Sequence, residues 1–87
     1  LTVPVRPFLG TIGIVPAGPG PHSGWVPTAH GGNMDCRELI AGTTVFLPVG
    51  IGGAMLSVGD GHAAQGDGEI GGTAMECCMD RAALTIT

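Results

Sequence analysis

The stretch AMLSVGDGHAA, Ala54–Ala64, decides the fold class of this chain. It follows the glycine-rich turn GIGG, 50–53, and its first half is an apolar segment typical of a short β-strand. Its second half, GDGHAA, is a polar, glycine-spaced segment typical of a turn. The pattern therefore predicts a strand that runs directly into a polar turn.

Further strands are expected on both sides of this stretch. FLGTIGIV, Phe8–Val15, predicts one strand, and TTVFLPV, Thr43–Val49, predicts another that Pro48 confines to a sheet edge or strand end. Helix is excluded from the first third of the chain by its six prolines: Pro4, Pro7, Pro16, Pro19, Pro21 and Pro27. These patterns indicate a β-type chain.

Three other segments allow weaker expectations. EIGGTAMECCM, Glu69–Met79, predicts a strand, with a helix over Thr73–Ala83 as an alternative that periodicity does not exclude. Asp35 is expected to cap one helical turn through Cys36–Ile40. AALTIT, Ala82–Thr87, has a strand pattern with no turn closing it, so we expect a chain that stops within an element.

The composition predicts a thin core. The 87 residues include 17 Gly and 7 Pro, and aromatic residues make up only 3%. Because large side chains bury the most area, such a chain needs more protein around it to bury its surfaces. Leu1 replaces an initiator Met, and no charged segment precedes an apolar one, so we expect a fragment without a signal peptide.

Charge and cysteine content exclude several classes of partner. The net charge is −4, with three Arg and no Lys, so no positive stripe for nucleic acid is present. No apolar run is long enough to span a membrane. Cys36 and the adjacent Cys77 and Cys78 fit no disulfide framework or zinc knuckle, which predicts reduced thiols in a cytoplasmic protein.

The segment GDGHAAQGDGE, Gly59–Glu69, is the richest in chemistry-bearing side chains. Asp60 and His62 are two apart, so on a strand they face the same side and supply two metal ligands. The glycines allow the backbone to turn so that Gln65 or Glu69 returns to the same point. One imidazole among oxygen ligands suits zinc or another first-row divalent ion better than calcium. The alternative is a polar surface turn that binds nothing.

A second polar cluster lies in HGGNMD, which contains His30, Asn33 and Asp35. This loop either supplies a ligand, a proton carrier or an amide-binding group, or forms an Asx-turn in which Asn33 and Asp35 bond only the backbone. Glu76 stands in the apolar stretch AMECCM, either as an outward residue of a half-buried strand or as a buried functional group.

Four segments carry a resemblance to a known family: PVRPFLGTIGIVPA (Pro4–Ala17), HGGNMDCREL (His30–Leu39), AGTTVFLPV (Ala41–Val49) and SVGDGHAAQGDGE (Ser57–Glu69). In this order, and from Pro4 to about Glu76, the chain resembles the central part of the acetamidase/formamidase family. The resemblance implies that residues 1–87 are a single partial domain. It also implies a mainly β fold with short strands and Gly/Pro-rich turns, part of a larger β-sandwich or barrel-like enzyme fold.

The resemblance further implies hydrolysis of formamide, acetamide or similar linear amides, with a divalent metal in some members. We expect zinc, with calcium as the alternative. The ligands are inferred from spacing as Asp60, His62 and Asp35. Glu69 is the expected general base, His30 a proton carrier or orienting group, and Glu76 a substitute ligand or base. Asn33 and Gln65 are expected to bind the substrate amide.

Three alternatives stay open from the sequence. The chain is a non-catalytic structural fragment, a metal-binding module without hydrolase activity, or a family member that acts on another amide such as a lactam. The expected partners are a small amide substrate and either further copies of the chain or the remaining segments of the same enzyme. An exposed β-edge and a thin core favour such association.

Overall fold

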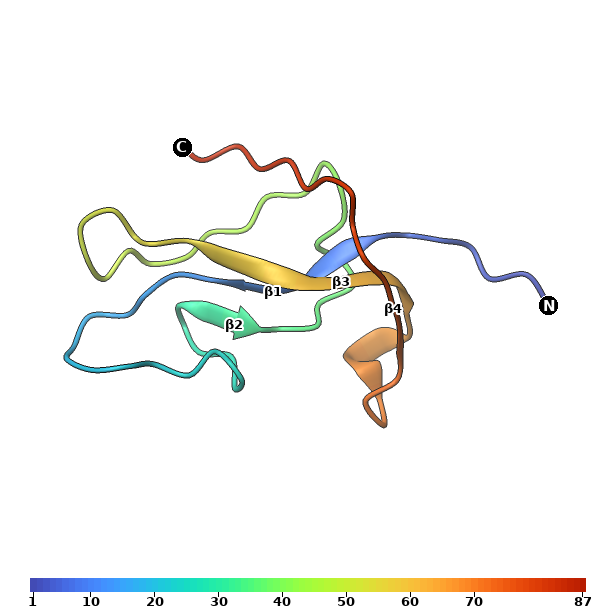
Figure 1. Ribbon diagram of the computed structural model, residues 1–87, viewed down its shortest axis with the longest axis horizontal. Coiled ribbons are helices and arrows are strands. Elements are labelled where there is room, and N and C mark those ends of the chain that lie inside the picture. Colours follow the sequence, from blue (N-terminus) through green and yellow to red (C-terminus); the bar gives the residue numbers. More distant parts are fainter.

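Four strands form one antiparallel sheet in the order β2-β1-β3-β4 in the computed structural model, which describes residues 1–87 (Figure 1). The elements are β1 (Phe8–Gly13), β2 (Gly31–Asn33), β3 (Ser57–Gln65), the 3₁₀ turn η1 (Asp67–Glu69) and β4 (Ala74–Glu76). No helix long and apolar enough to cross a membrane is present. The mainly β prediction is confirmed.

Strand β1 is central, and its two pairings decide which distant residues meet. On one side Thr11 lies opposite Asn33 of β2, and on the other Phe8 lies opposite His62 of β3. Burial alternates along β1, with Phe8 and Ile12 inside, as expected for a strand with one covered face. The central strand therefore brings the two polar clusters of the sequence to either side of itself.

Strand β3 is irregular where its polar residues lie. Its pairing with β4 shifts between His62 and Ala64, and Glu76 is the residue opposite His62. Asp60 has a left-handed φ of 59° inside this strand. Such irregularities re-aim side chains from the regular alternation of a strand.

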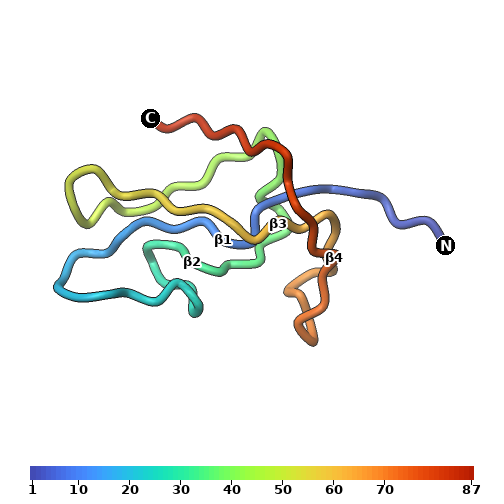
Figure 2. Tube along the Cα trace, in the orientation of Figure 1, coloured from blue at the N-terminus to red at the C-terminus, as the bar shows by residue number.

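The hydrophobic core is as thin as the composition predicts. Phe8 and Ile12 are its only fully buried apolar side chains, whereas Phe46 is 90% and Ile70 88% exposed. The radius of gyration is 13.7 Å, compared with about 12 Å for a compact domain of this length. Figure 2 shows why: long loops and the N-terminal segment extend well beyond the sheet.

The structure corrects several predicted elements. β1 confirms the strand predicted at Phe8–Val15. The strand predicted to begin at Ala54 starts only at Ser57, and it continues to Gln65, so the segment GDGHAA, predicted as a polar turn, is part of β3. The strands predicted at Thr43–Val49 and Ala82–Thr87 do not form, and the strand predicted over Glu69–Met79 is reduced to β4. The alternative helix over Thr73–Ala83 is absent. β-Propensity describes how side chains pack on a pleated surface, and these segments have no neighbouring strand to pair with.

The helical turn predicted after Asp35 is also wrong. The backbone φ of Asp35 is 46°, which is left-handed, whereas a helix N-cap has an extended conformation. A single turn, closed by Leu39 N–H donating to the Cys36 carbonyl at 3.0 Å, is all that follows. Asp35 is therefore free of a capping role, and its carboxylate turns towards the sheet.

Candidate metal centre

His62 is the centre of the site and the most buried large side chain of the chain, at 1% exposure. Phe8, its partner across β1 and β3, packs edge-on against the imidazole with ring centroids 5.1 Å apart. The Nε2 atom faces two carboxylates, 3.1 Å from Asp60 Oδ1 and 3.9 Å from Asp35 Oδ1. A buried imidazole thus presents one nitrogen to acidic oxygens contributed by two separate segments.

Gln65 determines which nitrogen of His62 carries the proton in the neutral ring. Its Nε2 donates to the Asp35 carbonyl at 2.6 Å, which directs its Oε1 towards His62 Nδ1, 2.8 Å away. Because Oε1 only accepts, Nδ1 must be the protonated nitrogen. The lone pair of neutral His62 therefore lies on Nε2, towards Asp60 and Asp35.

Asp35 is held by its backbone and by one of its two carboxylate oxygens. The Gly10 carbonyl accepts from the backbone N–H groups of both Met34 and Asp35, each at 3.0 Å. Asn33 Nδ2 donates to Asp35 Oδ2 at 2.8 Å. Asp35 Oδ1 is buried and has no hydrogen-bond partner. A buried carboxylate oxygen without a partner is costly and marks a place where a positive group belongs.

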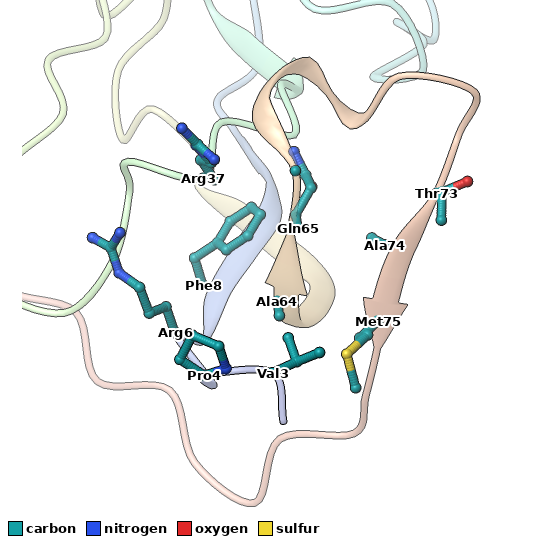
Figure 3. Close-up of a pocket in the computed structure, with 11 residues that line it drawn as sticks. Val3, Pro4, Arg6, Phe8, Arg37, Ala64, Gln65, Thr73, Ala74 and Met75 are labelled. Carbon is teal, nitrogen blue, oxygen red and sulfur yellow. The ribbon is translucent and has the colours of Figure 1, made fainter. Parts of the chain in front are cut away.

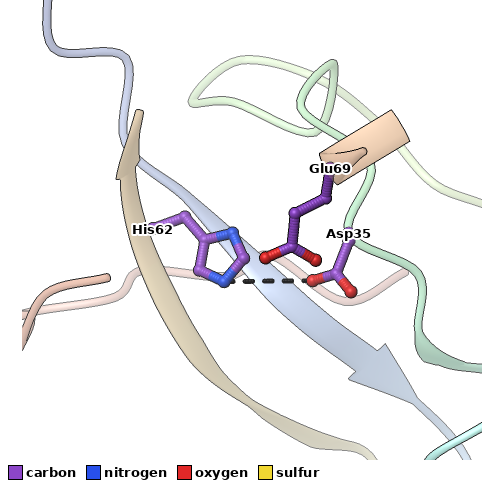
Figure 4. A group of neighbouring side chains, drawn as sticks. All are labelled: Asp35, His62 and Glu69. Carbon is purple, nitrogen blue, oxygen red and sulfur yellow. Dashed lines mark ion pairs between the residues drawn. The ribbon is translucent and has the colours of Figure 1, made fainter. Parts of the chain in front are cut away.

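Two sets of side chains share His62, and in each the ligand atoms lie within 4.8 Å of one another. The first is Asp35, His62 and Glu69, with Glu69 coming from η1 (Figure 4). In Figure 4 both carboxylates point towards the imidazole. The second set is Asp60, His62 and Glu76. Gln65 or Glu69 was expected to return to the point where Asp60 and His62 lie, and both side chains lie beside His62.

The crowding of carboxylates changes the acidity of the two central groups. Burial lowers the pKa of His62, but the Gln65 hydrogen bond and the Asp60 and Asp35 charges outweigh it, so the net pKa lies above the ordinary 6.5. Desolvation raises the pKa of Glu69 above 4.5, as does the charge of Asp35. Neighbouring carboxylates thus contribute to both pKa shifts, Asp60 and Asp35 at His62 and Asp35 at Glu69.

The space in the site also fits a cation. A Cβ added to Gly10 would come 2.6 Å from Asp35 Oδ1 and closer still to Asp60 Oδ2, so these two carboxylates face each other across a position that only glycine leaves open. Carboxylate oxygens and an imidazole nitrogen are ligands of divalent metals. The donors present therefore fit a divalent ion beside His62, either with Asp35 and Glu69 or with Asp60 and Glu76.

Two predicted site residues use both ends of their amides within the protein. Asn33 Oδ1 accepts from Thr11 Oγ1 at 2.7 Å, and its Nδ2 donates to Asp35. Both ends of the Gln65 amide are likewise bonded, to His62 and to Asp35. These bonds fix the orientation of each amide and leave one N–H and one oxygen lone pair on each.

His30 lies away from the cluster. Its carbonyl accepts from Ile14 N–H beyond the end of β1, whereas His62 pairs with Phe8 at the start of that strand. Six residues of extended chain correspond to about 20 Å. His30 Nδ1 lies 2.8 Å from the Pro48 carbonyl, and the ring lines a separate pocket of about 430 Å³ with His22. The structure does not bring His30 to the metal centre.

Gly10 and Thr11 are the site residues that the sequence did not reveal. Both lie on β1, more than twenty residues before Asn33 and Asp35, and no local spacing connects them to either cluster. Only the pairing of β1 with β2 and β3 places them there. The glycine in the middle of the predicted strand FLGTIGIV was the one available indication, because such a glycine often marks a close approach of other groups.

A pocket of about 440 Å³ adjoins the site, between the N-terminal segment, β3 and β4 (Figure 3). It shares Phe8 and Gln65 with the surroundings of His62 and is also lined by Arg6 and Arg37. None of the clustered carboxylates lines it. The chemistry therefore belongs to the cluster, and the pocket is its neighbour.

The sequence is similar to those of proteins named acetamidase and formamidase. The sequence model of the Acetamidase/Formamidase family matches residues 23–84. The chain is 52% identical over 44 residues to the acetamidase of Mycolicibacterium smegmatis, covering 51% of this chain and 11% of that protein. For the formamidase of Methylophilus methylotrophus the identity is 50% over 44 residues, with the same coverage.

A solved structure shows the same fold. The crystal structure of a predicted acetamidase/formamidase from the thermophile Thermoanaerobacter tengcongensis superposes with a TM-score of 0.81 and 43% identity, over 87% of this chain and 25% of that one. The chain thus spans about a tenth of the length of the curated relatives it matches and a quarter of this structural neighbour. Its sequence from residue 23 to 84 and its sheet place the chain in the acetamidase/formamidase family.

Proposed function

We propose that this chain supplies the metal centre of a hydrolase that converts small linear amides such as formamide and acetamide to carboxylate and ammonia. One observation carries the proposal: a buried imidazole, His62, faces acidic oxygens, one of which is buried without a partner. This arrangement lies in a member of a family whose relatives are named acetamidase and formamidase.

The ion would be held by Asp35, Asp60 and His62. His62 offers Nε2, because Gln65 fixes the proton on Nδ1. An imidazole among carboxylates favours zinc over calcium, which prefers oxygen ligands alone. The chemistry that a bound divalent ion supplies is Lewis acidity, which lowers the pKa of water and polarises an amide carbonyl.

Glu69 is the proposed general base. It is half-buried on η1, its carboxylate faces His62 and Asp35, and its pKa is raised by desolvation and by Asp35. A carboxylate with a raised pKa accepts a proton from water more readily and then returns it to the leaving ammonia. Glu76, opposite His62 on β4, is the substitute for this role or for a ligand.

Gln65 is assigned to orientation, in place of the substrate contact predicted for it. Its amide joins His62 to the backbone of Asp35 and so ties β3 to the loop after β2. Residues that hold a ligand histidine in one tautomer are a general feature of metal sites. His30 is left with no proposed role at this centre.

We further propose that residues 1–87 act as one segment of a larger enzyme. The accessible surface of 6263 Å² exceeds the value of about 4,700 Å² expected for a compact protein of this mass by roughly 1,600 Å². An excess of that size supports coverage by the remaining segments of the enzyme or by a second copy. The three free cysteines support a reducing, cytoplasmic compartment.

The same exposed surface supports the second candidate, a structural or metal-binding segment that has no activity alone. Ammonia release from formamide, acetamide and a lactam separates these possibilities, with metal content measured in parallel. We expect turnover of the linear amides, lost in Asp60→Ala/His62→Ala together with the metal, and lost in Glu69→Gln with the metal retained. Metal without turnover in the parent chain identifies the metal-binding segment, and turnover of the lactam alone identifies the other substrate class.

A further inference from the structure

Three side chains from two strands and a loop form a continuous hydrogen-bonded chain that ends at the metal centre. Thr11 Oγ1 of β1 donates to Asn33 Oδ1 at 2.7 Å, and Asn33 Nδ2 donates to Asp35 Oδ2 at 2.8 Å. Thr11 and Asn33 are direct partners across β1 and β2. Facing residues of an antiparallel pair lie close enough for such side-chain bonds.

The direction of the two bonds follows from the carboxylate, which only accepts. Asp35 must meet the amide nitrogen of Asn33, so the amide oxygen faces Thr11 and the hydroxyl donates to it. Without the Thr11 hydroxyl, the amide loses the bond at its other end and is free to turn away from Asp35. Thr11 therefore holds in place a group that reaches Asp35 only through Asn33.

The consequence appears at Asp35, the last residue of this hydrogen-bonded series. Asn33 occupies Oδ2 of Asp35, so Oδ1 is the single oxygen left over, and it is buried, unpartnered and 3.9 Å from His62 Nε2. We propose that Thr11 is a positioning residue of this centre, acting through Asn33 to present one oxygen of Asp35 beside His62. The inference rests on the proposed metal site and replaces the substrate contact predicted for Asn33.

The strand on the other side of Thr11 offers no competing partner. Its partner on β3 is Gly59, which has no side chain, and the position of a Cβ there meets no atom within 4 Å. The hydroxyl thus has Asn33 as its side-chain partner. This isolation allows Thr11 to be changed without touching β3.

The test compares Thr11→Val, which keeps the shape and removes the hydroxyl, with Thr11→Ser, which keeps the hydroxyl. Zn²⁺ affinity is measured for the whole chain by competition with a chromophoric chelator. We expect Thr11→Val to weaken binding about tenfold, the lower end of the effect of orienting residues around metals, and Thr11→Ser to restore it. Thr11→Ala is a second hydroxyl-free variant in case Val is not tolerated.

A metal-free readout separates this inference from the proposed function. Hydrogen exchange of the Asn33 side-chain amide is followed by NMR in the chain without metal, and we expect faster exchange in Thr11→Val and parent-like exchange in Thr11→Ser. Unchanged exchange in both hydroxyl-free variants overturns the positioning role. If the parent protein binds no Zn²⁺ while the exchange rates respond as expected, the proposed metal site is rejected. The hydrogen-bonded series from Thr11 through Asn33 to Asp35 is then still supported.

Additivity provides the remaining check. Thr11→Val and Asn33→Ala act through the same carboxylate, so the double variant should bind Zn²⁺ no more weakly than Asn33→Ala alone. Losses in affinity that simply add would show that the two residues act independently, which contradicts the inference.

Discussion

His62 Nε2 and Asp60 Oδ1 lie 3.1 Å apart, and the backbone of Asp60 has a left-handed φ of 59° inside β3. A non-glycine residue in this region is uncommon and is held there by its surroundings. Here the conformation directs the carboxylate towards Nε2 and across the open position at Gly10. This contact is the shorter of the two that join His62 Nε2 to a carboxylate, since Asp35 Oδ1 lies 3.9 Å away.

Gly10→Ala should weaken metal binding while leaving the sheet in place. The new methyl group would lie 2.6 Å from Asp35 Oδ1 and would displace Asp60 as well. We expect at least about a tenfold loss of Zn²⁺ affinity and destabilisation of about 1–3 kcal/mol from overpacking. Calorimetric titration with Zn²⁺ and chemical denaturation measure the two effects.

Gly59→Ala is the matched control on the neighbouring strand. A Cβ at Gly59 meets nothing within 4 Å, so affinity and stability should stay close to those of the parent chain. Equal affinities for Gly10→Ala and Gly59→Ala would show that the space at Gly10 is not part of the site.

The metal-free chain should lose stability as the pH rises. Burial lowers the pKa of His62, but Gln65 and Asp60 outweigh it, so the pKa in the folded chain lies above 6.5. Protonated His62 therefore stabilises the fold fully below pH 6.5, and this stabilisation is lost as the pH rises past the folded-state pKa. Glu69 acts with the same sign above pH 4.5, because its pKa is raised by desolvation and Asp35. The free energy of unfolding, measured by urea denaturation at a series of pH values up to 9, should fall as each group loses its proton.

Zn²⁺ affinity should change with pH in the opposite direction. The ion needs the unprotonated Nε2, so affinity should rise with pH until the folded pKa of His62 is passed and then level off. Binding enthalpies in buffers of different ionisation heat should report proton release below that point. Affinity that is flat from pH 5 to 8 would exclude His62 as a ligand.

Gln65→Leu should lower the pKa of His62. The variant removes the hydrogen bond that raises this pKa and leaves the burial that lowers it. NMR titration of the imidazole measures the shift, and Zn²⁺ affinity should fall about tenfold. A titration curve that coincides with that of the parent chain would contradict the tautomer assignment, and Thr73→Val, on the pocket wall outside the cluster, is the control.

The stability of the isolated chain should depend on its concentration. The chain exposes roughly 1,600 Å² more surface than a compact protein of its mass, and self-association would cover part of it. The denaturation midpoint should therefore rise over a hundredfold increase in concentration, and Phe46→Ser, which removes a side chain 90% exposed, should reduce the rise. A midpoint independent of concentration would show that the chain is stable as a monomer.

Local pattern predicted the parts of the site that lie within one segment. Asp60 and His62 were expected to face one side of a regular strand, and they do meet, although through the left-handed φ of Asp60 inside β3. Gln65 or Glu69 was expected to return through glycine turns, and both lie beside His62. The strand at Phe8–Val15 was also predicted, and β1 forms there with alternating burial. These features depend on a few neighbouring residues only.

The remaining features of the site depend on which strands pair with each other. The spacing of residues along the sequence does not show that pairing. Thr11 contacts Asn33 because β1 pairs with β2 in one register, and Gly10 closes the site because β3 lies on the other side. The strand expected at Thr43–Val49 failed for the same reason, since no strand lies beside it. His30 shares a polar segment with Asp35, but the intervening β2 carries the two residues apart.

Metal content of the chain, purified without chelators and measured by elemental analysis beside Asp60→Ala/His62→Ala, tests the central claim most directly. One divalent ion per chain, lost in the double variant while the sheet signal in circular dichroism persists, is the predicted result. A folded parent chain that holds no metal and takes up none from added Zn²⁺ would contradict the His62-centred site.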